Sequence, residues 1–195
     1  MDLARLHAAT GLLLAGLAVV VVDVRIDGFD VINDVVGAVP LLLGAARLAD
    51  VVPAGRRTGL SLAAPLVPAV LLGEIGGIGP LALLVDLAVM AFWLVVARAM
   101  TLLEWPPATE HLAARWQTHV RLTGTIEGVA LAVSAVRWVL AGRVDATVGG
   151  VGPIVLLAAV ATLGLLVHRV LVLMETRRWA RAASSRREVV GQREG

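Results

Sequence analysis

The segment from Ala146 to Val167 contains no charged residue and no histidine, and it constrains the fold more than any other part of the chain. At ~1.5 Å per residue, a helix over this segment would be about 33 Å long, enough to cross the ~30 Å hydrocarbon core of a bilayer. Hydrocarbon offers no partner for backbone amides, so a crossing segment of this kind must form a helix. The segment therefore predicts a membrane-spanning helix.

Five further apolar stretches have a similar character. Hydrophobic residues make up 58% of the 195-residue chain and charged residues 16%, against roughly 45–50% and 25% in an average soluble domain. We therefore expect an all-α fold, a polytopic membrane protein of six transmembrane helices arranged as three helical hairpins. The expected helices cover residues 8–24, 31–48, 58–74, 81–102, 120–141 and 150–174. They form a transmembrane domain over residues 1–176, followed by a basic cytoplasmic tail over residues 177–195.

The hairpin arrangement is supported by a faint internal repeat. Gly76-Gly77-Ile78-Gly79-Pro80 matches Gly149-Gly150-Val151-Gly152-Pro153, and an apolar run follows each copy. Proline fits the first turn of a helix, where its missing N–H has no intrahelical partner. The repeat predicts that each inward-running helix begins close to a Gly/Pro turn.

The distribution of arginine predicts the orientation. All 17 basic residues are Arg. With six crossings, fourteen of them, including Arg169 and the tail arginines, fall on the side that holds both termini, and only Arg25, Arg137 and Arg143 fall on the other. Under the positive-inside rule, the N and C termini are then cytoplasmic and the membrane is the cell (plasma) membrane.

Several function classes find no support in the sequence. The chain contains no Cys, which excludes thiolate metal sites and disulfides. Phosphate-binding loops, His-Glu-x-x-His and Gly-x-Ser-x-Gly are missing from the sequence. The arginines do not form the aromatic-interleaved stripe of a nucleic-acid binder. We predict no catalytic residue, no metal ligand, no cofactor and no nucleic-acid partner, and the sequence does not decide whether the chain is an enzyme.

Charged residues inside the predicted helices are the candidate functional groups. An ionised side chain at mid-membrane costs ~2.5–3.5 kcal/mol on insertion scales, so such residues face the bundle interior, pair or neutralise. The candidates for a substrate or ion site are Asp34, Asp86, Glu127 and Arg137. Their depths predict an outer pairing of Arg137 with Asp86 or Asp34. They also predict an inner polar group formed by Glu127 and His168.

Three hypotheses about function remain open at this point. The first is transport or binding of a small cation, a proton or a protonatable solute, since seven acids on the outer side would form a cation-attracting mouth. The second is a structural or interaction subunit of a membrane complex, including the substrate-binding subunit of an energy-coupling importer. The third is a lipid-head-group enzyme that uses the spaced acids from Asp23 to Asp34. The expected partners are the lipid bilayer, a small cationic solute or proton, and a membrane-protein partner or second copy.

The stretch Ile26-Asp27-Gly28-Phe29-Asp30, continued by Asp34, Gly37, Gly44 and Leu48, carries a family resemblance. It resembles the first hairpin of a family of small uncharacterised bacterial multi-pass membrane proteins. Asn33, where a proline is expected, and Ala38, where an aromatic residue is usual, depart from that pattern. The resemblance implies a small multi-pass membrane protein and says nothing about an activity.

Overall fold

The computed structural model of the protein describes residues 1–21, 25–26, 29–30, 34–53, 62–67, 80–141 and 152–191. Within these ranges the fold is all-α apart from one two-stranded ribbon. In chain order the elements are α1 (Leu3–Val21), β1 (Arg25–Ile26), β2 (Phe29–Asp30), α2 (Asp34–Val51), α5 (Pro80–Thr101), the 3-10 turn η2 (Pro107–Thr109), α6 (Glu110–Ala141) and α7 (Gly152–Gly191). The strands pair antiparallel, with Arg25 opposite Asp30 and Ile26 opposite Phe29.

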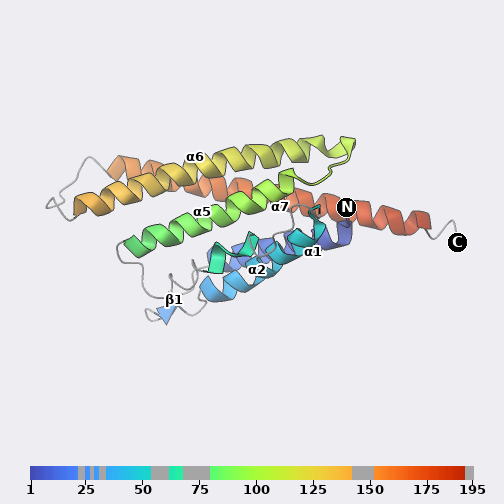
Figure 1. Cartoon of the computed structure of the whole chain (residues 1–195), viewed down its shortest axis with the longest axis horizontal. Helices are drawn as coiled ribbons and strands as arrows, with labels where there is room; N and C mark the ends of the chain where they lie inside the picture. Colours follow the sequence, from blue (N-terminus) through green and yellow to red (C-terminus); the bar gives the residue numbers. More distant parts are fainter. Residues whose placement is uncertain are drawn as a thin grey trace.

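The five long helices lie roughly along a common axis (Figure 1). The N-terminal start of α1 and the C-terminal end of α7 lie at one end of the bundle, and the β1–β2 ribbon lies at the other. Within the described ranges, three helices contain a stretch long and apolar enough to cross a membrane, namely Leu3–Val20, Leu83–Thr101 and Pro153–Arg186. This feature indicates a membrane protein. The helix predicted over residues 58–74 falls largely outside the described residues.

The outer surface of the bundle is apolar over much of its length. In an apolar 18-residue window of Pro153–Arg186, only 11% of the residues are buried within the protein. Large exposed aliphatic side chains occur on α2, α5, α6 and α7, among them Val39, Leu43, Leu84, Leu87, Val129, Val136, Leu156, Leu157, Val160 and Leu163. A soluble monomer rarely exposes so wide an apolar surface, whereas a lipid-facing surface requires one.

Glycines allow α1 and α2 to pack at very close range. A Cβ atom at Gly16 would lie 2.6 Å from Leu41 Cγ and 2.7 Å from the backbone oxygen of Gly37. A Cβ at Gly44 would lie 2.9 Å from Leu13 Cγ and 3.0 Å from the oxygen of Ala9. Small residues at helix contacts permit this approach, and van der Waals packing drives helix association in lipid. The α1–α2 pair is therefore a tight hairpin that closes one side of the bundle.

Two predicted helix boundaries are wrong. The last helix was expected to end at residue 174, but α7 continues to Gly191. The stretch between Gly164 and Gly191 contains no Gly or Pro, and its Ala and Arg residues favour helix. The fifth helix was expected to begin at residue 120, but α6 begins at Glu110 directly after η2. Both helices therefore extend beyond their apolar segments at the end of the bundle that holds the termini.

Candidate polar site between helices α6 and α7

A buried ion pair joins α6 to α7. Arg169 Nη2 donates a hydrogen bond to Glu127 Oε1 at 2.6 Å, and the two side chains are only 6% and 15% exposed. The second carboxylate oxygen, Glu127 Oε2, is enclosed and receives no hydrogen bond from the described residues. Half of this carboxylate is thus paired with the guanidinium and half has unused acceptor capacity.

Arg169 is held on two further sides. Its Cζ atom lies 4.2 Å from the centroid of the buried Trp93 ring on α5, in a cation–π arrangement. Its Nε–H donates to His119 Nε2 at 3.3 Å. A guanidinium has no acceptor, so the direction of this bond is fixed. The arginine is therefore fixed by one contact from each of α5 and α6 in addition to Glu127.

The same bond assigns the proton on His119. Because Nε2 accepts from Arg169, the proton of the neutral ring sits on Nδ1 and is donated to Nδ1 of His168 at 3.1 Å. The two imidazole rings stack with centroids 5.3 Å apart. His119 is fully buried, and the Oγ1 of Thr123 lies 3.5 Å from its Nε2. A directed hydrogen-bond chain runs from Arg169 through His119 to His168.

Polar residues continue from this group toward the end of the bundle that holds the termini. On α6 they recur every fourth residue, a spacing that keeps neighbouring side chains close on a helix. These residues are His111, Arg115, His119, Thr123 and Glu127. Glu175 on α7 pairs with Arg115 and lies 3.5 Å from His111 Nε2. Between these two groups the indole Nε1 of Trp116 donates to Thr176 Oγ1 at 3.1 Å, with both residues fully buried. We call this line of contacts between α6 and α7 the polar seam. It runs from His111 and Glu175 at one end to Glu127 and Arg169 at the other.

A cavity of about 220 Å³ lies next to Glu127. Its lining includes a second carboxylate, Asp86 on α5, together with the hydroxyl-bearing residues Ser134 and Thr162 and the thioether of Met90. Asp86 is exposed, whereas Glu127 is largely enclosed. The cavity has room for several water molecules. The structure thus brings two of the four predicted site residues to one space, and one of them is accessible from outside the bundle.

The other predicted site residues are only partly described. Asp34 is the first residue of α2 and Arg137 lies in the last two turns of α6, but the contacts of their side chains fall outside the described residues. The predicted outer pairing therefore remains a prediction. Glu127 and His168 lie in the same polar group, as expected, but each has another direct partner: Arg169 for Glu127 and His119 for His168.

Three residues of this site were missed or misplaced in the sequence. Arg169 was counted with the cytoplasmic arginines, yet it is 5% exposed inside the bundle. The sequence pattern did not single out His119 or Trp116, and both are fully buried. A usable signal existed for Arg169, since it interrupts an apolar run that continues to Met174. The four-residue spacing on α6 was the corresponding signal for His119.

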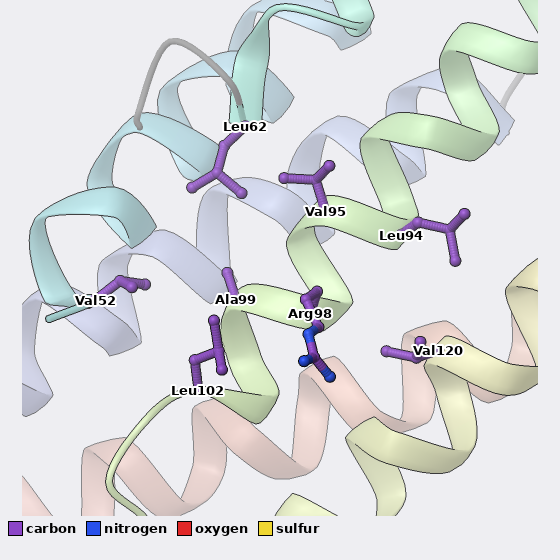
Figure 2. Close-up of a pocket in the computed structure, with 8 residues that line it drawn as sticks. All are labelled: Val52, Leu62, Leu94, Val95, Arg98, Ala99, Leu102 and Val120. Atoms are coloured by element: carbon purple, nitrogen blue, oxygen red, sulfur yellow. The ribbon is translucent and has the colours of Figure 1, made fainter. Parts of the chain in front are cut away.

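A second cavity, of about 400 Å³, has a different chemistry (Figure 2). It lies among Val52 and Leu62, the face of α5 that carries Leu94, Val95 and Ala99, and Val120 of α6. Among the described residues that line it, Arg98 is the one charged side chain, and the others are aliphatic. Such a hollow offers a ligand few polar groups for specific recognition, so it is not our candidate for a substrate site.

The described residues contain no group of three or more His, Asp or Glu side chains that could hold a metal ion. The spaced acids from Asp23 to Asp34, on which the enzyme hypothesis rests, have side chains outside the described residues. Comparisons with family models, curated proteins and solved structures return no match to this chain. The resemblance to small bacterial multi-pass proteins is therefore still a prediction, and the function must be argued from the site.

Proposed function

We propose that this chain is a six-span protein of the plasma membrane that binds and transports a proton or small cation through the cavity between Asp86 and Glu127. The observation that carries the proposal is the half-paired carboxylate of Glu127. One oxygen is paired with Arg169, the other has no partner among the described residues, and the residue lines the same cavity as Asp86. Ionisable groups at membrane depth are expensive to retain and commonly lie on ion pathways.

The direction of the helices supports six crossings. Both α2 and α5 run from the ribbon end of the bundle toward the end that holds the termini (Figure 1). The predicted helix over residues 58–74 would return the chain from the end of α2 to the start of α5. One such crossing gives six in total, with both termini on the same side. The excess of arginine on that side favours a cytoplasmic location for it.

The position of the site along the helices suits an ion pathway. Counting ~1.5 Å per residue from the ribbon end, Asp86 lies about 9 Å along α5 and Glu127 about 21 Å along α6. His119 lies about 33 Å along α6, near the expected inner boundary of a ~30 Å hydrocarbon core. Asp86 is then the outer acid and Glu127 the deeper one, and the polar seam connects Glu127 to the cytoplasmic end.

Arg169 acts as a fixed internal counter-charge in this proposal. A guanidinium stays protonated in proteins, so Arg169 does not itself pass a proton along the seam. A proton or cation that reaches Glu127 from the cavity competes with Arg169 for the carboxylate. When the carboxylate is neutralised, Arg169 loses an ionic partner but keeps its contacts with Trp93 and His119. Because Arg169 competes with the incoming proton or cation for the carboxylate, binding of that ion at Glu127 is reversible.

A structural subunit is the competing function, and the same ion pair favours it. Arg169 contacts α5 and α6 from α7, so it fixes three helices relative to one another. A purely structural role requires Glu127 but makes no use of Asp86, which is exposed and has no ion-pair partner among the described residues. Asp86 is therefore the residue that separates the two functions.

The test is proton flux in proteoliposomes that contain the purified full chain and an entrapped pH-sensitive dye. Under an imposed pH gradient with a potassium potential clamp, the wild-type protein should accelerate dye response over empty liposomes. Asp86→Asn should remove most of this flux while leaving the unfolding temperature unchanged. Asp50→Asn, an exposed acid at the end of α2 outside the cavity, is the matched control and should retain full flux.

Sodium and potassium gradients across the same liposomes test the small-cation form of the proposal. If Asp86→Asn conducts protons, sodium and potassium as well as wild type does, transport through this cavity is wrong and the structural function is favoured. The same conclusion follows if the wild-type protein moves none of the three ions.

A further inference from the structure

A third cavity, with concentrated positive charge, lies between α1 and α7. It measures about 210 Å³ and is lined by His7, Leu14, Met174, Arg177, Arg178 and Arg181. The two helices lie side by side at the end of the bundle that holds the termini (Figure 1). The three arginines fall within little more than one turn of α7, so three guanidinium groups are gathered at one cavity.

These arginines are not neutralised by the described carboxylates. Among the described residues, no carboxylate oxygen lies within 4.0 Å of a guanidinium nitrogen of Arg177, Arg178 or Arg181. Glu175, the nearest acid along α7, is engaged by Arg115 and His111 of α6. The positive charge at the cavity is thus available to an anion.

The cavity wall is adapted to one of the guanidinium groups. A Cβ at Gly11 would lie 3.3 Å from Arg177 Nε and 3.4 Å from its Cζ, so the side chain of Arg177 lies against the bare backbone of α1. On the same side His7 Nδ1 lies 3.2 Å from the backbone oxygen of Arg177 and must donate to it. These two contacts fix the orientation of α1 against Arg177 and help to define the cavity.

The cavity is amphipathic along the bundle axis. Leu14 and Met174 lie deeper in the bundle than His7 and Arg177, because α1 and α7 run in opposite directions. The Trp105 and Trp179 rings, with centroids 5.3 Å apart, lie near the same level of the bundle as the arginines. Tryptophan pairs of this kind are enriched at the headgroup level of a membrane. The charged end of the cavity therefore faces the headgroups and its apolar end faces the acyl chains.

We propose that this cavity binds the phosphate headgroup of an anionic phospholipid. The phosphate would accept hydrogen bonds from the three arginines, and the part of an acyl chain nearest the headgroup would pack against Leu14 and Met174. Arginine presents a planar fork of donors that matches phosphate oxygens. Basic pockets between helices on the cytoplasmic side of a membrane are suited to such headgroups. Free phosphate would use the arginines equally well but would gain nothing from the apolar end. The proposal does not depend on the transport function.

Native mass spectrometry provides the test. The full chain is mixed in detergent with defined mixtures of phosphatidylglycerol and phosphatidylcholine, and the lipids that stay bound after removal of the detergent are counted. The wild-type protein should retain phosphatidylglycerol in preference to phosphatidylcholine. The double variant Arg177→Gln/Arg181→Gln should reduce this preference by about 25-fold, since each such arginine contributes roughly fivefold. The matched double variant Arg121→Gln/Arg186→Gln removes the same charge from exposed positions outside the cavity and should leave the preference intact.

A charge-neutral variant keeps the test independent of net charge. Gly11→Leu should displace Arg177 from α1 and lower the preference for phosphatidylglycerol while the net charge stays the same. Equal losses in the two double variants would show diffuse attraction to the basic tail and overturn the cavity site. Calorimetric binding of inorganic phosphate at millimolar concentration, without any preference between the two lipids, would overturn the lipid as the ligand.

Discussion

Glu127 on α6 and Arg169 on α7 are 42 residues apart in sequence, yet they form a 2.6 Å ion pair at the deep end of the polar seam. Burying either charge alone would cost far more free energy than burying the two as a pair. The pair therefore sets the register between the two longest helices. It also fixes the position of the deeper carboxylate of the proposed pathway.

Removing either member of this pair should destabilise the bundle by about 3–5 kcal/mol, because an uncompensated buried charge is left behind. We expect Arg169→Gln to cost more than Glu127→Gln, since Arg169 also contacts Trp93 and His119. The double variant should lose less than the two single losses combined. Thermal unfolding in detergent measures all three, and strictly additive losses would mean that the two residues do not interact directly. Asp2→Asn, in an exposed pair with Arg5, is the control and should change little.

Asp86→Asn should not lower the free energy of unfolding, because the substitution removes a costly charge from the membrane and breaks no ion pair among the described residues. Asp86 is exposed, and its carboxylate forms no ion pair among the described residues. The same unfolding assay provides the measurement. A loss of more than 2 kcal/mol would instead support the outer pairing with Arg137 that the sequence suggested, and a matching loss in Arg137→Gln would identify the partner.

Gly16→Ala should destabilise the protein by about 1–3 kcal/mol, because overfilling a close contact forces the backbones apart. The added methyl group would lie 2.7 Å from the oxygen of Gly37, which cannot move without shifting α2. Gly164→Ala is the matched control on α7, where a Cβ has nothing within 4 Å. We expect Gly164→Ala to be neutral or slightly stabilising, since alanine has the higher helix propensity. Equal unfolding temperatures for the two variants would contradict the close packing of α1 on α2.

Thr176→Val should cost about 1–3 kcal/mol, because it leaves the buried indole N–H of Trp116 without an acceptor. In a Trp116→Phe background the same change should cost much less, since the unsatisfied donor is then gone. A double-mutant cycle measured by chemical unfolding in detergent provides the comparison. The prediction fails if Thr176→Val costs the same in both backgrounds.

The chain contains no Cys, so single cysteines report topology against a silent background. Asp30→Cys, in β2 at the ribbon end, should react with a membrane-impermeant maleimide in intact cells. Ser185→Cys, in the C-terminal part of α7, should react only after the cells are permeabilised. Labelling of both positions from the same side would overturn the even number of crossings that we propose.

Local sequence was sufficient to predict the five long helices of the described residues and their apolar character. The uncharged stretch from Ala146 to Val167 lies within α7 except for the residues before Gly152, and residues 81–102 correspond closely to α5. Helix boundaries beyond the apolar runs were predicted less well, as the continuation of α7 to Gly191 shows. Hydropathy marks where lipid begins, whereas a helix ends only where Gly, Pro or an unsatisfied backbone makes it end.

The sequence by itself determined that this chain buries its backbone in helices with apolar exteriors, because each helix satisfies its own hydrogen bonds and needs no partner to do so. Only the tertiary structure decided that Glu127 faces Arg169 and that His119 faces His168. The choice of partner depends on how far each helix is rotated and shifted along its neighbour. The glycine contacts of α1 with α2 and the ring of Trp93 belong to that packing, and a residue spacing within one helix carries no information about it.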